Sequence, residues 1–448
     1  MTRALAFLLA ACLCAAADAP AAGRPAKFIP TFLVYYGGGP PFTADDAARL
    51  AKFDLLDVDR FRYANIGGNT WAAVKALNPD LEIYLYEMGP ESPSYLDSLP
   101  PQQLNGLGRH DVSRGHPMGS LNGNQPGLFL RDVAGNRVYN TAFSDRNASR
   151  YWYLMDFGSR AYQAYWLEAV RADIVAQPWV ADGVHADNCL ALPTFIAYSA
   201  TPARYYTNTA WSAAMNAFAG AITSGLHAYG QRLWCNRGES RQAKGAAAWL
   251  SLDASAAPPD VVGEEGAFAV AFGAGATQFY PEADWKRQLD TIGAIRNSRV
   301  AVFSSTKLPV DGWGTDNWGK PVSFWQSLWY AMGSFLLAKY DVLNNAYFNF
   351  YGNGGAFSHI WWYEEYERID LGLALAPYAV ATIDGINIYW REFELGYVLV
   401  NPTAGDVASI VLPQPCRQLT HDNLGAAPSA PLTAIPLGGH SAAILLKN

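Results

Sequence analysis

The sequence has few charged residues. Charged side chains make up 16% of the 448 residues, and the formal net charge is −7, whereas a typical soluble domain carries about 25% charged residues. No run of Lys or Arg occurs anywhere in the chain. Binding to nucleic acid or to an anionic membrane surface needs a cluster of positive charge. We therefore expect neither partner.

Cysteine is also scarce. Of the five cysteines, two lie in the N-terminal leader, and Cys189, Cys235 and Cys416 remain in the body of the chain. Three cysteines make no disulfide framework, and their spacing fits no zinc motif. Free or buried thiols are favoured, and one bridge between Cys189 and Cys235 stays open as the alternative.

Motifs for metals, nucleotides and serine nucleophiles are absent as well. Three candidate metal ligands, His110, Asp111 and His116, lie with Asp132 in one long loop, but their spacing matches no known module. The glycine triplet at 37–39 is neither a dinucleotide fingerprint nor a P-loop, and no G-x-S-x-G occurs. We expect no metal and no cofactor.

The N-terminus has the pattern of a targeting segment. Residues 4–14 carry no charge, follow Arg3 and precede small residues, which predicts a signal peptide over 1–19. The expected location is secreted or periplasmic, with lipidation at Cys12 as the alternative, because residues 9–12 resemble a lipoprotein attachment box. No other stretch is apolar for long enough to span a membrane. We expect a monomer.

The rest of the chain alternates short apolar segments with amphipathic ones. We predict eight strands, each followed or preceded by a helix: 31–37, 54–59, 82–88, 183–188, 232–236, 260–265, 299–304 and 346–351. Eight such units close into a (β/α)₈ TIM barrel over 27–377, and an open doubly wound sheet is the alternative. Strand-like runs separated by turns then predict a small antiparallel β-sandwich over 378–448.

One connection is too long for a simple barrel. Residues 89–150 are rich in Pro, Gly, Asn and Ser and show little periodicity. Long loops in compact domains are often functional, and this one follows the third strand, so we expect it over the active face. It ends in an extended piece that could bring Asp156 to the site.

Two predicted strands end in acids. The fourth ends at Asp187, after His185 and before Asn188, and the sixth ends in Glu264 and Glu265. The C-terminal ends of parallel barrel strands meet at one rim, and paired carboxylates there are typical of glycoside hydrolases. We predict Asp187 as the nucleophile and Glu264 as the acid/base of a retaining reaction. Since neighbouring strand residues face opposite sides, only one of Glu264 and Glu265 can face the site, and the reverse assignment stays open.

Other strand ends supply candidate substrate-binding residues. With Glu265, these are Tyr36, Glu87, Asp156, His185, Asn188, Arg237, Asn349 and Tyr351.

Three motifs carry a family resemblance: the Asp-Gly-Val-x-x-Asp-Asn strand at 182–188, the Asp-x-Val-x-Glu-Glu strand at 260–265 and the segment 389–402. They resemble glycosyl hydrolase-like family 15 and its relatives, which include the endo-α-1,4-polygalactosaminidases. The resemblance implies a secreted polysaccharide hydrolase with a TIM barrel, with its nucleophile at Asp187 and its acid/base at Glu264. This chain departs from the family pattern at His185 and Gly266, which leaves the sugar open.

Three functions are compatible with these observations. A glycoside hydrolase acting on a polysaccharide or oligosaccharide is favoured. A non-catalytic carbohydrate-binding barrel is the alternative, and glycan affinity without released reducing ends would distinguish it. A scaffold or adhesin component predicts a blocked or acid-free barrel mouth, which the two acidic strand ends argue against.

Overall fold

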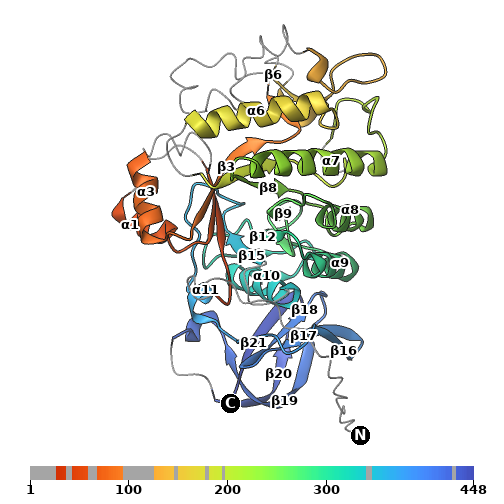
Figure 1. Cartoon of the computed structure of the whole chain (residues 1–448). Helices are drawn as coiled ribbons and strands as arrows, with labels where there is room; N and C mark the ends of the chain where they lie inside the picture. The colour runs from red at the N-terminus through yellow and green to blue at the C-terminus, as the bar shows by residue number, and fades with distance from the viewer. Residues whose placement is uncertain are drawn as a thin grey trace.

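A barrel of eight parallel strands forms the centre of the molecule (Figure 1). The computed structural model describes residues 27–36, 43–58, 68–93, 126–145, 150–176, 181–193, 197–339, 346–425 and 430–448. The barrel strands, in their order around the sheet, are β1 (Phe32–Tyr35), β2 (Leu55–Val58), β3 (Glu82–Met88), β7 (Gly183–Asp187), β8 (Arg232–Asn236), β9 (Val261–Glu265), β12 (Arg299–Ser305) and β15 (Ala346–Tyr351). All eight match predicted strands, and the predicted fold class is confirmed.

Helices between the strands cover the outside of the barrel. They are α1 (Ala44–Leu50), α3 (Gly68–Leu77), α6 (Arg160–Ala176), α7 (Asn208–His227), α8 (Ala243–Asp253), α9 (Glu282–Ala294) and α10 (Phe324–Ala338), with the short α11 (Glu365–Arg368) after β15. Side-chain caps fix several of their starts. Thr43, Thr207 and Ser323 each accept a hydrogen bond from a backbone N–H in the first turn of the helix that follows, as helix N-termini require.

Side chains close the barrel between β15 and β1. Backbone pairing there is limited to the region of Thr31 and Phe348. Above it, Asn349 Nδ2 donates to the Phe32 carbonyl at 2.5 Å, and the Tyr351 hydroxyl accepts from Val34 N–H at 2.6 Å. The sheet is therefore nearly closed by backbone bonds, and side-chain bonds complete the ring.

The barrel interior is packed with large side chains. At its lower end, Arg299 donates to Glu82 at 2.7 and 2.9 Å, and Arg232 pairs with the same carboxylate. Above this ion pair lies Trp234, packed edge-on against Phe32 and Tyr84. Gly263 makes room for the indole, because a Cβ there would lie 2.9 Å from Trp234 Nε1.

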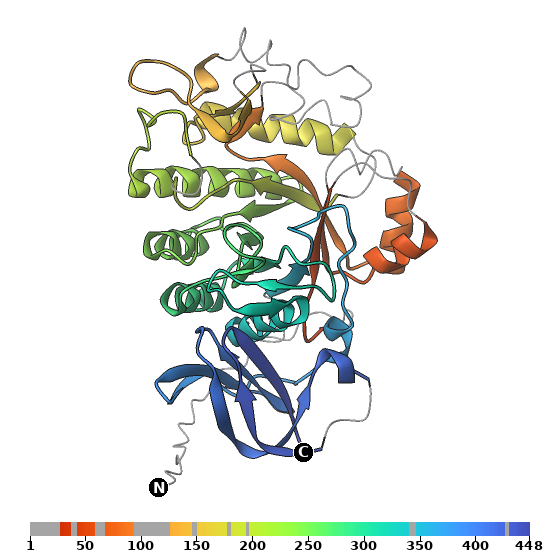
Figure 2. The same cartoon turned by 180° about the vertical axis from the view of Figure 1, so that it is seen from behind.

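The long connection after β3 contains a small sheet that the sequence pattern did not predict. Strands β4 (Glu91–Pro93), β5 (Tyr139–Asp145) and β6 (Arg150–Leu154) form an antiparallel sheet in the order β4–β6–β5. It lies at the upper end of the molecule in Figures 1 and 2, at the opposite end from the C-terminal sheet. We call it the insert sheet.

Two short hairpins extend the loops after β9 and β12. The first pairs β10 (Ala269–Val270) with β11 (Gln278–Phe279), and the second pairs β13 (Trp313–Thr315) with β14 (Pro321–Ser323). The hairpins bond to each other through Ala276 N–H and the Thr315 carbonyl. Both belong to βα connections, so they lie on the same side of the barrel as the acidic strand ends.

Six antiparallel strands form the C-terminal domain, in one continuous sheet that starts just after the predicted boundary at 377. Their order is β16 (Ala379–Ile383), β17 (Ile386–Glu392), β18 (Gly396–Asn401), β21 (Ser441–Lys447), β19 (Val407–Leu419) and β20 (Leu432–Leu437). One face, with Val398, Val400 and Ile444, joins the barrel core, whereas the other face encloses a smaller core around Leu399, Ile435 and Leu445.

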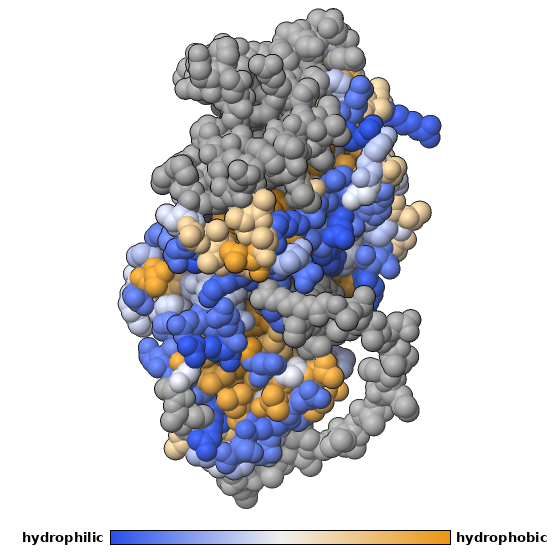
Figure 3. Space-filling model, turned by 60° about the vertical axis from the view of Figure 1, so that its left-hand side comes forward, coloured by the Kyte–Doolittle hydropathy of each residue, from blue (hydrophilic) through white to orange (hydrophobic). Residues whose placement is uncertain are grey.

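Hydrophilic and hydrophobic side chains are interleaved on the molecular face in Figure 3. None of the helices in the described part of the chain has the length and apolar character that a membrane crossing needs. Cys189, Cys235 and Cys416 are buried free thiols, so the alternative disulfide is not formed. The predicted signal peptide and Cys12 lie outside the described residues.

Candidate active site

Three neighbouring strands bring their last inward-facing residues together at the C-terminal rim. These residues are Asp187 on β7, Asn236 on β8 and Glu265 on β9. Asn236 Nδ2 donates to Asp187 Oδ1 at 2.8 Å and to Glu265 Oε2 at 2.9 Å. One amide nitrogen therefore joins two carboxylates from separate strands.

Asp187 is held as an acceptor by three donors. Besides Asn236, the Tyr86 hydroxyl donates to Oδ2 at 2.8 Å and the Asn188 backbone N–H donates to Oδ1 at 2.8 Å. Asn188 has φ of 56°, in the left-handed region, which turns the chain out of β7 directly after the acid. Both oxygens of Asp187 accept hydrogen bonds, as an ionised carboxylate does.

The surroundings of Glu265 shift its pKa. Burial and the negative charge of Asp187 raise the pKa of Glu265 to about 7, although the Asn236 hydrogen bond and His185 act in the opposite direction. Two interacting carboxyl groups resist ionising together. The pair can thus hold one proton near neutral pH.

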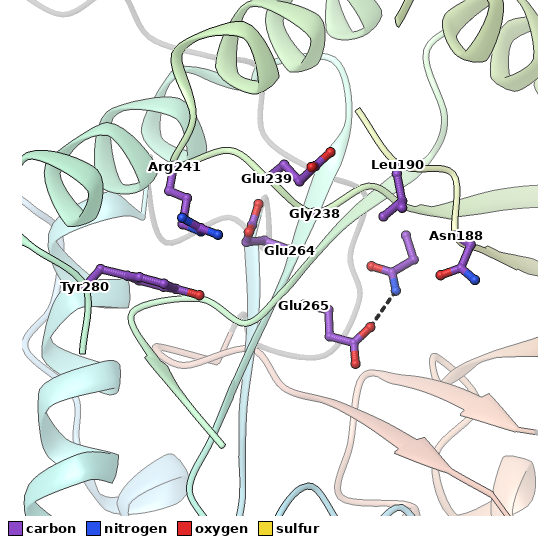
Figure 4. Close-up of a pocket in the computed structure, with 9 residues that line it drawn as sticks. Asn188, Leu190, Gly238, Glu239, Arg241, Glu264, Glu265 and Tyr280 are labelled. Carbon is purple, nitrogen blue, oxygen red and sulfur yellow. Dashed lines mark hydrogen bonds between the residues drawn. The ribbon is translucent and has the colours of Figure 1, made fainter. Parts of the chain in front are cut away.

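Glu264 lies on the other side of β9. Ser240 N–H donates to its Oε2 at 3.0 Å and Gln288 Nε2 to its Oε1 at 3.1 Å, and the residue is 2% exposed. Figure 4 shows Glu264 and Glu265 pointing in opposite directions from the strand. The expectation that Glu264 faces Asp187 therefore does not fit this placement. Strand alternation allowed either Glu, and only the packed structure distinguishes them.

A buried polar chain lies beneath the carboxylate pair. His185 Nδ1 is 2.5 Å from Asp57 Oδ2, and the Tyr36 hydroxyl donates to the same oxygen. Burial lowers the pKa of His185, but the charge and hydrogen bond of Asp57 outweigh it, so the pKa lies above its usual value. Burial raises the pKa of Asp57, which His185 partly offsets. Asp57 is not among the site residues predicted from the sequence, because acids near strand ends often serve only helix and loop contacts.

Glu91, on the insert sheet, is a site residue that the sequence analysis missed. Its carboxyl group is fully buried and accepts from Asn188 Nδ2 at 3.0 Å and from Asn140 Nδ2 at 3.1 Å. Burial raises its pKa to about 8. Its position directly after β3, at Gly89-Pro90-Glu91, is the signal that could have found it.

Five predicted substrate-binding residues lie away from the mouth. Glu87, on the outward-facing side of β3, and Arg237, directly after β8, are fully buried. Asn349 and Tyr351 complete the barrel seam. Asp156 accepts hydrogen bonds from Arg204 and from the Tyr205 hydroxyl, so it anchors the segment before α7. The polar groups of Asn349, Tyr351 and Asp156 are thus used in structural contacts.

The remaining predicted residues, Tyr36, His185, Asn188 and Glu265, do gather at the site. The ring of Tyr36 packs against Tyr86 and Phe357, with centroids 4.8 and 5.3 Å away. Asn236, which the prediction omitted, ends its strand at the same level as Asp187. Its inward position on β8 was the available signal.

A pocket opens beside Glu265. Its lining residues are Asn188, Leu190, Asn236, Gly238, Glu239, Arg241, Glu264, Glu265 and Tyr280, most of which are labelled in Figure 4. Phe272 stands nearby, because a Cβ on Gly266 would lie 4.0 Å from its ring, and it is 42% exposed. Among the described residues, no group of three or more His, Cys, Asp or Glu is placed to hold a metal ion.

Comparison with solved structures gives matches over nearly the whole chain. A GH27 β-L-arabinopyranosidase from Geobacillus stearothermophilus is similar at 11% identity, covering 94% of this chain and 97% of that one, with a TM-score of 0.47. An isomalto-dextranase from Arthrobacter globiformis T6, complexed with panose, is similar at 11% identity, covering 94% and 72%, with a TM-score of 0.45. The comparison with curated proteins gave no match.

A protein-family comparison matches residues 75–397, which include β3, every later barrel strand and both carboxylates of the site. The matching family is described as hypothetical glycosyl hydrolase family 15. More than half of the chain is matched, and the matched part contains the paired carboxylates that glycosidic cleavage needs. The chain therefore belongs to hypothetical glycosyl hydrolase family 15 and is a glycoside hydrolase with a carbohydrate substrate.

Proposed function

We propose that the enzyme cleaves a polysaccharide or oligosaccharide with retention of anomeric configuration, with Asp187 as nucleophile and Glu265 as acid/base. The observation that carries the proposal is the shared amide of Asn236. The two N–H bonds of an amide nitrogen diverge by roughly 120°, so its two acceptor oxygens lie about 5 Å apart. Retaining enzymes hold their carboxyl groups about 5–5.5 Å apart, and inverting ones about 6.5–9.5 Å.

The two acids have environments suited to different roles. Asp187, with three donors on its carboxylate, is ready to attack the anomeric carbon. Glu265, with its raised pKa, can hold the proton that the leaving oxygen needs. The glycosidic C–O bond breaks as the Asp187 ester forms, and the proton moves from Glu265 to the leaving oxygen.

The second half of the reaction reverses these roles. Glu265, now a carboxylate, accepts a proton from water, and the water oxygen attacks the anomeric carbon. The ester bond to Asp187 breaks, and Glu265 regains its proton. The Asn236 amide bonds to both acids, so it keeps the spacing of their carboxyl groups fixed.

The rings around the mouth support a carbohydrate substrate of more than one sugar. Tyr36, Tyr86 and Phe357 lie on one side of the carboxylates, and Phe272 lies on the side of Glu265. Aromatic faces pack against the C–H faces of sugars. The N-terminal leader of the sequence supports secretion as part of the same proposal.

The central test uses three matched variants. Asp187→Asn and Glu265→Gln should each lower kcat by about a thousandfold or more, measured as reducing ends released from a polysaccharide panel. Glu264→Gln, at the neighbouring position, should lower kcat far less than Glu265→Gln, because that side chain, although it lines the same pocket, faces Ser240 and Gln288. Near-native turnover in Glu265→Gln, with loss in Glu264→Gln, would reverse the assignment.

Product stereochemistry tests the retaining mechanism separately. Proton NMR of a digest, recorded before mutarotation, should show the anomer of the substrate linkage as the first product. Initial release of the opposite anomer would exclude Asp187 as a covalent nucleophile.

A further inference from the structure

The geometry points to His185 as a positioning residue whose imidazolium, held by Asp57, controls the ionisation of the Asp187–Glu265 pair. This inference rests on the proposed function, because it assigns a role within the same site. His185 lies two residues before Asp187 on β7, on the same inward face and one layer deeper in the barrel. Its side chain is 5% exposed, so it reaches the substrate only through the carboxylates above it.

Hydrogen bonding determines the protonation of one nitrogen of the His185 ring. His185 Nδ1 lies 2.5 Å from Asp57 Oδ2, and the Tyr36 hydroxyl donates to that same oxygen. An oxygen that accepts from two donors is most stable as a carboxylate. Nδ1 therefore carries a proton, and the buried Asp57 charge needs a positive partner.

Other acids also surround the ring. The titratable groups facing it from the packed elements are Asp57 on β2, Tyr36 after β1, Tyr86 on β3, Asp187 on β7, Glu265 on β9 and, through Asp57 and Glu265, Tyr351 on β15. Every carboxylate in this set favours a protonated imidazole. Nε2 is buried without a hydrogen-bond partner among the described residues, which opposes its protonation, so the imidazolium depends on these negative charges.

The charge of the His185 ring in turn affects the ionisation of the catalytic carboxyl groups. The positive charge of His185 lowers the pKa of Glu265, against the stronger effects of burial and Asp187. Without that charge, a second negative charge beside Asp187 would be harder to form. In the second half-reaction Asp187 is an uncharged ester, and the positive charge of His185 then favours the Glu265 carboxylate that accepts a proton from water.

The ligand-free enzyme provides the first test. In ¹⁵N-histidine NMR of the full chain, the His185 signal, assigned by its loss in His185→Gln, should still be that of an imidazolium at pH 7, above the ordinary pKa of about 6.5. In Asp57→Asn, the ring should titrate at a lower pH than in the wild type, because Asp57, the largest charge that opposes the effect of burial, is then gone. A neutral ring at pH 7 in the wild type would overturn the inference.

The second test is a pH–rate profile on the panel polysaccharide that the wild type degrades. His185→Gln should move the alkaline limb, which reports Glu265, upward by about one pH unit, because loss of the positive charge raises the pKa of that carboxyl group. A structural role alone would lower kcat without moving the limbs. His227→Gln, which removes an exposed histidine paired with Asp260, is the control and should leave the profile unchanged.

The outcomes separate this inference from the proposed function. A superimposable profile in His185→Gln overturns the inference while Asp187 and Glu265 keep their roles. Full activity in Glu265→Gln overturns the proposed function, and the ring titration in ligand-free enzyme remains measurable. If His185→Gln does not fold, His185→Asn and the Asp57→Asn titration decide the question.

Discussion

Glu91 illustrates how one buried acid can link two parts of the fold. It comes from the insert sheet, yet it accepts from Asn188, whose backbone N–H donates to Asp187. A fully buried carboxyl group favours its neutral form, and the pKa of about 8 reflects that burial. Glu91 therefore supports the nucleophile without adding a second full charge beside it at neutral pH.

The raised pKa of Glu91 predicts a pH-dependent stability. The folded protein keeps the Glu91 proton up to about pH 8, whereas the unfolded chain releases it near its ordinary value of about 4.3. Stability from this group is thus fully present below the unfolded pKa and declines as pH rises to about 8. The melting temperature of Glu91→Gln, relative to wild type, should rise by about 5 °C between pH 5 and pH 8.

Calorimetry at several pH values checks this expectation. The difference in melting temperature between Glu91→Gln and wild type should then stay constant above the folded pKa of Glu91. Above that pH, Glu91 is ionised in both the folded and the unfolded wild type. A difference that is flat from pH 5 to pH 8 would mean that Glu91 is ionised in the folded enzyme at neutral pH.

At the scale of elements, the barrel closes differently at its seam from elsewhere. Between the other barrel strands, backbone ladders supply the bonds, but between β15 and β1 the amide of Asn349 and the hydroxyl of Tyr351 take their place. The Tyr366 hydroxyl, from α11, donates to Asn349 Oδ1 at 3.0 Å. The polar ends of β15 that resembled substrate ligands in the sequence are thus used to close the ring.

Substitution at the seam should cost stability. Asn349→Ala leaves the buried Phe32 carbonyl and Tyr366 hydroxyl without this partner, which should lower the free energy of unfolding by about 2–3 kcal/mol. Tyr366→Phe removes one of the same bonds and should cost about 1 kcal/mol. Urea unfolding followed by fluorescence measures both. Equal losses of stability in Asn349→Ala and Tyr366→Phe would show that the Asn349 amide is not the main contact between β15 and β1.

At the scale of the whole molecule, the C-terminal sheet and the barrel share a core. Residues of β18 and β21 pack in the same cluster as α10. The approach is close at Gly333, where a Cβ would lie 2.6 Å from Ala442 Cβ and 3.2 Å from Val400 Cγ2. The sheet has only a small core of its own, so the two parts should unfold together.

Gly333 tests this coupling. Gly333→Val should force α10 and the sheet apart and lower the free energy of unfolding by about 2–3 kcal/mol. The control is Gly220→Ala on α7, where the nearest atom to the new Cβ lies 3.6 Å away, and where a helical Ala should stabilise by up to about 1 kcal/mol. Scanning calorimetry should show a single transition in both. A separate early transition in Gly333→Val would mean that the sheet unfolds independently.

The sequence by itself determined the eight barrel strands, the helices between them and the strand ends at which Asp187 and the glutamate pair lie. These features follow from local patterns: apolar runs, capping residues and the period of two along a strand. The insert sheet was not predicted as a sheet, because β4 and β5 lie in a segment without clear periodicity; only the extended piece that contains β6 was expected. Strands β16 and β20 lie partly exposed and lack a strong apolar pattern, so the local sequence predicts them only weakly.

Only the tertiary structure decided which glutamate faces the site, and that Asn236, Glu91 and Asp57 contact the other site residues. A strand's alternation gives two faces but does not say which is inside, and both Glu264 and Glu265 find polar partners. Likewise, the spacing of two carboxylates depends on the tilt and stagger of strands that are far apart in the chain. Those distances arise when the barrel closes, since local sequence constrains each strand but not how neighbouring strands pack.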